Sequence, residues 1–201
     1  MVGIDVGITR FATLSDGEVF EPQNNFRKYE GALARAQKSL SRKKKYSENW
    51  KKEKAKVQGI HKRIGNARKD YIHKATTMIS KKHAIICIED LKVSNMSKSA
   101  SGTVENPGKN VMAKSGLNKS ILDQGWYEFR RQLSYKTEWH GGQLLLVPPH
   151  NTSRTCPSCS YVSGDNRKTQ SKFLCVSCGY SENADLVGAT NILRAGHAQL
   201  A

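Results

Sequence analysis

The sequence predicts an α/β protein with a small metal-binding element close to its carboxyl terminus. Short apolar runs, which are typical of strands, alternate with longer amphipathic runs, which are typical of helices, along the 201 residues. Two Cys-x-x-Cys pairs stand 15 residues apart near the end of the chain, and one further helical run follows them. These observations together predict a sheet with flanking helices and a cysteine-rich insertion before the last helix.

The first twenty residues predict a β-meander. Val2, Ile4 and Val6 alternate with small or polar residues, which is the period of a strand with one buried face. Residues 15–17 (Ser-Asp-Gly) form a turn motif, after which the apolar pattern returns at residues 19–20. We therefore expect the sheet to begin at the first residues of the chain.

A basic helical segment is predicted from about residue 30 to 82. Apolar residues recur there at steps of three, four or seven and indicate one buried stripe on a long helix: Trp50, Val57, Ile60, Ile64, Tyr71, Ala75 and Met78. The remaining faces are rich in Lys and Arg and favour contact with phosphates without base readout. The side chains expected to contact nucleic acid are Arg42, Lys43, Lys44, Lys45, Lys51, Lys52, Arg63, Arg68 and, beside the first cysteine, Arg154.

The middle of the chain predicts two further strands and a helix. Residues 84–88 form a continuous apolar run that suits a strand buried on both faces and ends at Glu89. Residues 93–119 show little periodicity and predict a mobile loop, either a lid or a disordered linker. A second amphipathic helix is expected over residues 121–139, and the run at 143–147 predicts the last strand.

The two cysteine pairs predict a structural zinc site. Cys156, Cys159, Cys175 and Cys178 have the spacing of two knuckles around one tetrahedral ion. A closed set of four thiolates is structural rather than catalytic, so we expect one Zn²⁺. Disulfide pairing is the alternative. The amino terminus lacks a charged leader and a long apolar run, so we expect a cytoplasmic protein with reduced cysteines.

Three acids are candidates for a second metal site. Asp5 lies inside the first predicted strand, Glu89 ends the middle strand, and Asp185 opens the last helical run. Strand pairing can bring Asp5 beside Glu89, and packing of the last helix can add Asp185. Three carboxylates bind Mg²⁺ or Mn²⁺ well, and two such ions can support phosphodiester hydrolysis. This arrangement in a basic protein is typical of a nuclease.

Each acid also has a simpler interpretation. Asp5 could belong to a turn or an edge strand, and Glu89 could pair with a lysine while Asp90 takes its place. Asp185 could merely interact favourably with the helix dipole, with Asn183 as the N-cap.

The charge of the chain favours a polyanionic partner. Lys and Arg number 33 against 17 Asp and Glu, which gives a formal net charge of +16. Nucleic acid is the usual partner of such a protein, and a solvated basic surface is the alternative. No stretch approaches the ~20 apolar residues of a membrane-spanning helix, so a membrane is not an expected partner.

Several motifs resemble those of a known family. They are residues 3–7 (Gly-Ile-Asp-Val-Gly), 88–91 (Ile-Glu-Asp-Leu), the cysteine pairs with Gly179, and Asn183-Ala-Asp185-x-x-Gly188-Ala-x-Asn191-Ile, with Lys43–Lys45 and Gly125-Trp126-x-x-Phe129 in support. They resemble the RuvC-type nuclease half of TnpB (OrfB) proteins, which are RNA-guided nucleases encoded by bacterial insertion sequences and related to miniature type V CRISPR effectors. The resemblance extends from Met1 to about His197. Ser160 departs from it, because many members have Gly there.

The resemblance implies an RNase H-like (RuvC) fold with a mixed sheet, flanking helices and an inserted zinc ribbon with four cysteine ligands. It implies a nuclease core over residues 1–150, a ribbon over 151–181 and a final helix over 182–201. Asp5, Glu89 and Asp185 would be the catalytic acids that hold two Mg²⁺ or Mn²⁺ ions. Members are associated with transposition, and cleave DNA under the guidance of an RNA in a bacterial or archaeal cytoplasm.

The family normally has an oligonucleotide-binding barrel and a helical recognition region before its first catalytic strand, whereas this chain begins four residues before Asp5. We therefore expect a Mg²⁺-dependent, RuvC-type DNA endonuclease without its guide-RNA and target-recognition half. The alternative is a catalytically silent nucleic-acid-binding remnant. A third interpretation is a purely structural interaction module with incidental acids.

Overall fold

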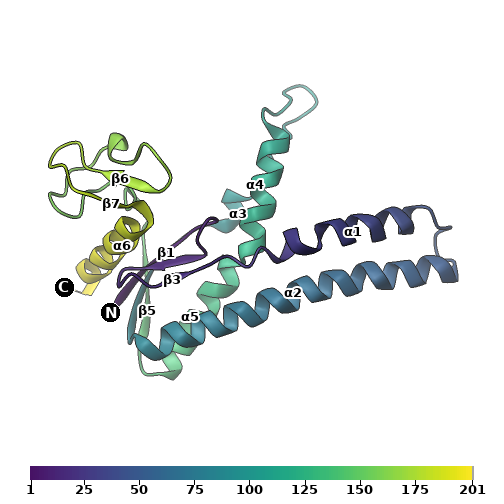
Figure 1. Ribbon diagram of the computed structural model, residues 1–201, viewed down its shortest axis with the longest axis horizontal. Coiled ribbons are helices and arrows are strands. Elements are labelled where there is room, and N and C mark those ends of the chain that lie inside the picture. Colours follow the sequence, from purple (N-terminus) through teal and green to yellow (C-terminus); the bar gives the residue numbers. More distant parts are fainter. Residues whose placement is uncertain (201) are drawn as a thin grey trace.

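The centre of the molecule is a five-stranded mixed sheet (Figure 1). The computed structural model describes residues 1–200. The strands lie in the order β3-β2-β1-β4-β5, with β1, β2 and β3 antiparallel and with β4 and β5 parallel to β1. Their bounds are β1 Val2–Val6, β2 Ala12–Leu14, β3 Val19–Phe20, β4 Ile85–Glu89 and β5 Gln143–Val147. The predicted α/β class, the initial meander and both later strands are confirmed.

The two faces of the sheet have different partners because side chains alternate along each strand. Ile4 and Ile88 face the main hydrophobic core, which helices α2 (Glu48–Lys82) and α5 (Trp126–Trp139) complete. Cys87, between Ile86 and Ile88, packs in a separate cluster against helix α6 (Ala184–Leu200) on the opposite face. Asp5 follows Ile4, and Glu89 follows Ile88. Both acids therefore belong to the opposite face of the sheet, which α6 covers.

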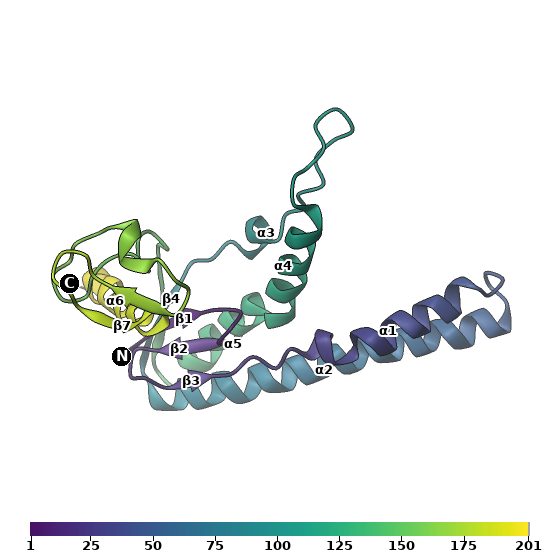
Figure 2. The same cartoon turned by 45° about the horizontal axis from the view of Figure 1, so that its top comes forward.

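The basic helical segment consists of two antiparallel helices, not one continuous run. Helix α1 (Asn25–Ser41) packs along the first half of α2, and this hairpin extends away from the sheet (Figure 2). The chain reverses at residues 42–47, where Tyr46 has a φ of 68° and the Ser47 hydroxyl accepts a hydrogen bond from the Trp50 backbone N–H. Residues 42–45 in this reversal are four consecutive cations. They offer no apolar side chain that a continued helix could bury, so the helix ends there.

The expected apolar stripe on α2 is only partly right. Ile64 and Ala75 are buried, but Met78 is 47% exposed. Ile72 and Ile79 are buried instead. The carboxyl half of α2 contacts both α5 and the core side of the sheet, so it buries a wider arc than a single stripe.

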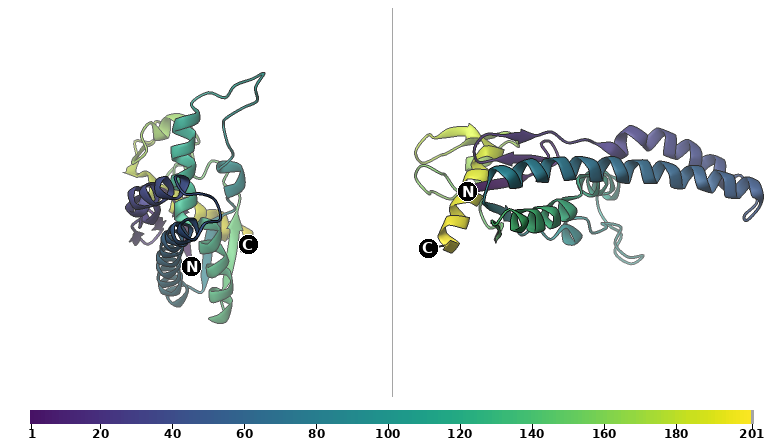
Figure 3. Two further views of the ribbon diagram at one scale, coloured as in Figure 1. Left: turned by 90° about the vertical axis from the view of Figure 1, so that its right-hand side faces the viewer. Right: turned by 90° about the horizontal axis from the view of Figure 1, so that it is seen from below.

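The prediction of a mobile loop over residues 93–119 is wrong for much of that segment. The structure has helices α3 (Val93–Met96) and α4 (Val111–Gln124) there, with an irregular connection between them. Helix α4 projects from the body of the molecule, and Met112 on it is 90% exposed (Figure 3). A helix that buries so little of its surface needs no apolar stripe, which explains the missing periodicity.

The helix expected over residues 121–139 is divided at Gly125. This glycine has a φ of 71° and ends α4 immediately before α5 begins. A left-handed backbone conformation favours glycine and stops an α-helix. The apolar residues continue across the break because both helices contribute to the same core.

The cysteine-rich segment lies between β5 and α6 and contains its own two-stranded sheet. We call residues 151–183 the ribbon. It comprises a 3₁₀ turn, η1, and the antiparallel strands β6 and β7: their bounds are η1 Gly164–Arg167, β6 Lys172–Leu174 and β7 Ser181–Asn183. Throughout residues 1–200, every helix is too short or too polar to span a lipid bilayer.

Helix α6 contacts β1 with almost no space between the two backbones. A Cβ built on Gly3 would lie 2.1 Å from the Ala189 carbonyl oxygen and 2.5 Å from the Leu193 backbone nitrogen. Such contacts are impossible without movement, and backbone atoms cannot rotate away. Glycine at position 3 therefore determines how closely α6, and Asp185 with it, can approach the sheet.

We expect Gly3→Ala to destabilise the chain by about 1–3 kcal/mol, because the added methyl group forces α6 from β1. Thermal unfolding should show a melting temperature lower by several degrees. Gly59→Ala is the matched control, since nothing lies within 4 Å of its would-be Cβ in the interior of α2. That change should be neutral or stabilising. Equal melting temperatures for Gly3→Ala and the wild type would contradict this account of the packing.

Candidate active site and cysteine cluster

Asp5 and Glu89 are neighbours at the carboxyl ends of two paired strands. In the parallel register of β1 and β4, Ile4 lies opposite Ile88, and the next residue along each strand is Asp5 or Glu89. Both belong to the α6 face. The carboxylate of Asp5 is in contact with α6, because a Cβ built on Gly188 would lie 3.0 Å from its Oδ2 atom.

Asp185 lies in the first turn of α6, one helical turn before Gly188. The side-chain oxygen of Asn183 accepts hydrogen bonds from the backbone N–H groups of Asp185 and Leu186, at 3.0 and 3.4 Å. Asn183 is therefore the N-cap, and it determines where the helix begins. Asp185 lies close enough to the end of β1 for its charge to raise the pKa of Asp5.

The pKa of Asp5 is raised by burial and by the two other acids. Burial raises the pKa of Asp5 to about 8, and the charges of Glu89 and Asp185 act in the same direction. The guanidinium of Arg167 opposes this effect. With a pKa of about 8, the Asp5 carboxyl group is mostly protonated at neutral pH, and a nearby cation would favour its ionised form.

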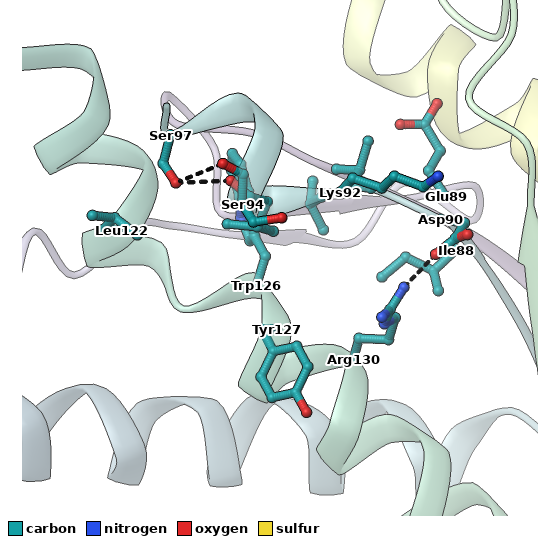
Figure 4. A pocket seen from close by; sticks show the side chains of 13 residues that line it. Ile88, Glu89, Asp90, Lys92, Ser94, Ser97, Leu122, Trp126, Tyr127 and Arg130 are labelled. Carbon is teal, nitrogen blue, oxygen red and sulfur yellow. Dashed lines mark hydrogen bonds and ion pairs between the residues drawn. The ribbon is translucent and has the colours of Figure 1, made fainter. Parts of the chain in front are cut away.

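Glu89 is turned toward α6 in Figure 4, whereas Asp90 forms an ion pair with Arg130. Asp90 is thus engaged elsewhere and does not replace Glu89 on this face. The hydroxyl of Thr152 donates a hydrogen bond to Glu89. Burial raises the pKa of Glu89, while the Thr152 hydrogen bond and the charge of Arg167 act against the increase.

Asn191 connects this site to the ribbon. Its buried side-chain amide donates hydrogen bonds to the Thr152 and Thr155 carbonyl oxygens, at 2.7 and 2.8 Å. The amide therefore holds the beginning of the ribbon on α6 and keeps Thr152 within reach of Glu89. Thr152 was not predicted as a site residue, and the only signal for this link was Asn191 within the C-terminal motif.

Arg167 is a second site residue that the sequence did not single out. Its guanidinium lies 3.5 Å from the Oδ1 atom of Asp185 and donates to the Gln170 carbonyl oxygen at 3.0 Å. Arg167 and Arg154 also line a polar cavity of about 430 Å³ on the ribbon. The structure therefore places Arg167 beside Asp185, and Arg154 shares the ribbon cavity with Arg167.

The four cysteines of the ribbon form a compact cluster. Their Sγ atoms all lie within 4.8 Å of one another, and the Cys156–Cys178 and Cys159–Cys175 pairs are each 3.6 Å apart. A tetrahedral ion with Zn–S bonds of about 2.3 Å needs sulfurs about 3.8 Å apart. The donor set and its spacing therefore fit a metal ion. Within residues 1–200, no other group of three or more metal-binding side chains is so closely spaced.

The two halves of the cluster have the same backbone geometry. Ser160 and Gly179 follow the second cysteine of each pair, with φ angles of 61° and 75°. Each donates its backbone N–H to the carbonyl oxygen of the first cysteine in its pair, Cys156 or Cys175, at 2.9 or 3.0 Å. Ser160 thus occupies a left-handed position that favours glycine.

We expect Ser160→Gly to stabilise the ribbon by up to about 1 kcal/mol, because it relieves a left-handed conformation at a non-glycine residue. The reciprocal change, Gly179→Ser, should destabilise the ribbon by a similar amount. Both effects can be measured by following ribbon unfolding during titration with a metal chelator. Opposite signs for the two substitutions are the expected outcome, and a destabilising Ser160→Gly would contradict the argument.

The predicted nucleic-acid contacts lie mainly at the far end of the helical hairpin. Residues 42–45 and Lys52 are exposed there, and Lys51 is exposed with an ion pair to Glu48, whereas Arg63 is exposed farther along α2. Arg68 differs from them, because its guanidinium is 2.7 Å from the buried carboxylate of Asp123. The remaining residue in the prediction, Arg154, is exposed on the ribbon and lines the cavity shared with Arg167.

The class of the protein follows from this fold and from its solved relatives. The "Cryo-EM structure of the Cas12f1-sgRNA-target DNA complex" superposes with a TM-score of 0.60 over 96% of this chain and 49% of that chain, at 19% sequence identity. The fold is therefore the RNase H-like (RuvC) fold with an inserted cysteine ribbon.

Family models and curated relatives identify the family. Residues 1–100 match the model OrfB_IS605, described as "Probable transposase", and residues 126–192 match the "Cas12f1-like, TNB domain". The chain is 63% identical over 201 residues, all of this chain and 50% of the relative, to "Putative RNA-guided DNA endonuclease InsQ" of Escherichia coli (strain K12). It is 36% identical over 196 residues, 97% of this chain and 45% of the relative, to "Putative RNA-guided DNA endonuclease" of Streptomyces pristinaespiralis. The chain belongs to the TnpB (OrfB) family of insertion-sequence proteins, and it spans about half the length of these curated relatives.

Proposed function

We propose that this chain carries the DNA-cleaving site of a TnpB-type endonuclease and hydrolyses phosphodiester bonds with the help of divalent cations. The observation that supports the proposal is the raised pKa of Asp5, which results from burial and from the charges of Glu89 and Asp185. Surplus negative charge of this kind favours hard cations with oxygen ligands, and so Mg²⁺ or Mn²⁺. The names of InsQ and its Streptomyces relative support DNA as the substrate.

We propose two ions, as in other two-metal nucleases, in which the ions lie about 3.5–4 Å apart. Asp5, Glu89 and Asp185 would hold them. When bound, such a pair polarises the scissile phosphate and lowers the pKa of the attacking water.

The remaining side chains are assigned by their contacts. Thr152 orients the Glu89 carboxylate through its hydrogen bond, and Asn191 holds Thr152 in place. Arg167 lies beside Asp185, where its positive charge can attract a phosphate of the substrate strand. Arg154 lines the ribbon cavity together with Arg167, and we propose that it contacts a neighbouring phosphate.

The ribbon and the hairpin complete the proposal. One Zn²⁺ bound by the four cysteines would hold the ribbon against α6, with residues 1–150 and helix α6 forming the nuclease core around it. The exposed cations at residues 42–45 would contact the nucleic-acid backbone without reading its sequence. A cytoplasmic location, in which the cysteine thiols stay reduced, is part of this proposal.

The test is cleavage of single-stranded DNA by the purified chain, compared with Glu89→Gln. We expect cleavage that requires Mg²⁺ or Mn²⁺ and is lost in Glu89→Gln, while both proteins bind DNA equally in Ca²⁺. Gln at this position keeps the size of the side chain but removes its charge. Equal cleavage by both proteins would exclude the assigned role of Glu89. Salt-dependent binding without any cleavage would support a silent nucleic-acid-binding protein instead.

A further inference from the structure

A large cavity adjoins the acids on the other face of the sheet. It encloses about 730 Å³ at the carboxyl ends of β1 and β4, and it is bounded by α3 and by the junction of α4 with α5 (Figure 4). Glu89 lies at its edge, while Ile88 contributes to its wall. Cavities of several hundred Å³ are typical of small-molecule and cofactor sites, so this one is large enough for a nucleoside.

The wall of the cavity includes a mostly buried aromatic ring. Trp126 lines the cavity and is only 6% exposed. Its indole N–H makes no hydrogen bond to any described residue, and the nitrogen itself is inaccessible from the cavity. Trp126 therefore contributes the apolar part of its ring to the wall.

The walls and the edge of the cavity differ in chemistry. Tyr127 and Leu122 add an aromatic ring and an aliphatic side chain to the wall, next to Trp126. Two cations, Lys92 and Arg130, lie toward the edge where Glu89 and Asp90 are found (Figure 4). Lys92 has no ion-pair partner within residues 1–200, whereas Arg130 is paired with Asp90. A ligand with a flat, uncharged ring and an anionic group outside it suits this arrangement.

We propose that the cavity binds the base of one nucleotide in the substrate strand, next to the phosphate that the acids cleave. This inference rests on the proposed function. A strand that crosses the carboxyl ends of β1 and β4 would place its phosphates by Asp5 and Glu89 on one face and an adjacent base in the cavity on the other. The base contacts the aromatic side chains that line the cavity, and Lys92 contacts the flanking phosphate. Only an unstacked base can enter, so the cavity favours single-stranded DNA.

The first experiment maps cleavage around a missing base. A 5′-labelled single-stranded DNA with one abasic residue is cleaved in Mg²⁺, and the cleavage frequency is recorded at each distance from that residue. At one fixed distance the missing base falls in the cavity, and we expect cleavage there to decrease by about tenfold. Ser94→Phe, which fills the cavity from its α3 wall, should abolish this local decrease. Ser99→Phe, an exposed change outside the cavity, should retain it.

The second experiment measures binding without cleavage. In Ca²⁺, the affinity for an oligothymidylate is compared with that for a wholly abasic strand of the same length. Ser94→Phe should weaken binding of the oligothymidylate several-fold and leave binding of the abasic strand unchanged. Ser99→Phe should change neither.

The outcomes separate this inference from the proposed function. Cleavage that is uniform around the abasic residue would overturn the base-binding cavity while leaving the nuclease intact. If the chain does not cleave DNA, the proposed nuclease function fails. The binding measurements in Ca²⁺ then test on their own whether the cavity binds a base. Equal effects of Ser94→Phe on both strands would then overturn the inference.

Discussion

Asp5→Asn is expected to abolish DNA cleavage and at the same time to stabilise the metal-free chain. Loss of cleavage by at least about a hundredfold follows if Asp5 binds the catalytic cations, because weaker perturbations around metal ligands already reduce activity 10–100-fold. The gain in stability follows from the raised pKa. Folding brings Asp5 from a pKa of 3.8 to about 8, so the native state resists ionisation of this group.

The raised pKa of Asp5 makes the stability of the metal-free chain depend on pH. A group whose pKa is raised by folding contributes its full stability below the unfolded pKa and loses it as the pH rises through the folded value. The free energy of unfolding of the metal-free wild type should therefore decrease between about pH 4 and pH 8. The asparagine side chain of the variant does not titrate, so Asp5→Asn should lack this component and be more stable at pH 8 by about 1–3 kcal/mol.

Denaturant unfolding at several pH values, with and without Mg²⁺, measures both effects. Mg²⁺ should stabilise the wild type and not Asp5→Asn, because only the wild type offers the carboxylate. Asp70→Asn is the matched control, since Asp70 is an exposed residue paired only with Lys74. It should change stability by less than about 0.5 kcal/mol. A less stable Asp5→Asn chain, or one that still cleaves DNA, would contradict the assignment.

Removal of zinc is the second change with a large expected effect. Structural zinc contributes about 10–16 kcal/mol of apparent binding energy in zinc-finger peptides, so the ribbon should unfold when the ion is removed. Cys175→Ser or a chelator should therefore increase hydrogen exchange over residues 152–183 and leave β1 and β4 protected. Cleavage should be lost as well, although the cysteines do not belong to the acidic site.

The physical reason for that loss is the connection through Thr152 and Asn191. An unfolded ribbon releases Thr152 from Glu89 and takes Arg167 away from Asp185. Cys87→Ala is the matched control, because Cys87 lies in the sheet and outside the cysteine cluster. It should retain one zinc ion per chain. Absence of stoichiometric zinc in the wild type, or unchanged exchange in Cys175→Ser, would contradict the prediction.

Much of the fold could be predicted because the local pattern of apolar and polar residues indicates which side chains are buried. The alternation at Val2 and Ile4 and the continuous apolar run before Glu89 indicated strands with one or two covered faces, and the structure has strands there. Helix α4 could not be predicted in the same way. It buries few side chains, so its sequence has no apolar periodicity that would indicate a packing partner.

The candidate site shows a similar division. The sequence motifs and the strand ends indicated Asp5, Glu89 and Asp185, and their catalytic role stays a prediction. Thr152 and Arg167 could not be assigned, because their importance arises from contacts across 63 and 18 positions of the chain. Such contacts depend on how the ribbon packs on α6. A threonine or an arginine in a polar segment has no pattern that reveals this packing.

The position of Asp5 on the first strand and of Asp185 on the last helix has a consequence for the order of events during synthesis. The sheet can pair β1 with β4 long before α6 exists, but the third acid is added 180 residues after the first. At about 5–20 residues per second, this corresponds to roughly 10–40 s of translation. A nascent chain therefore carries an incomplete set of acids until α6 has been made. On the proposed assignment, the acidic site is complete only after α6 has been made and has packed on the sheet.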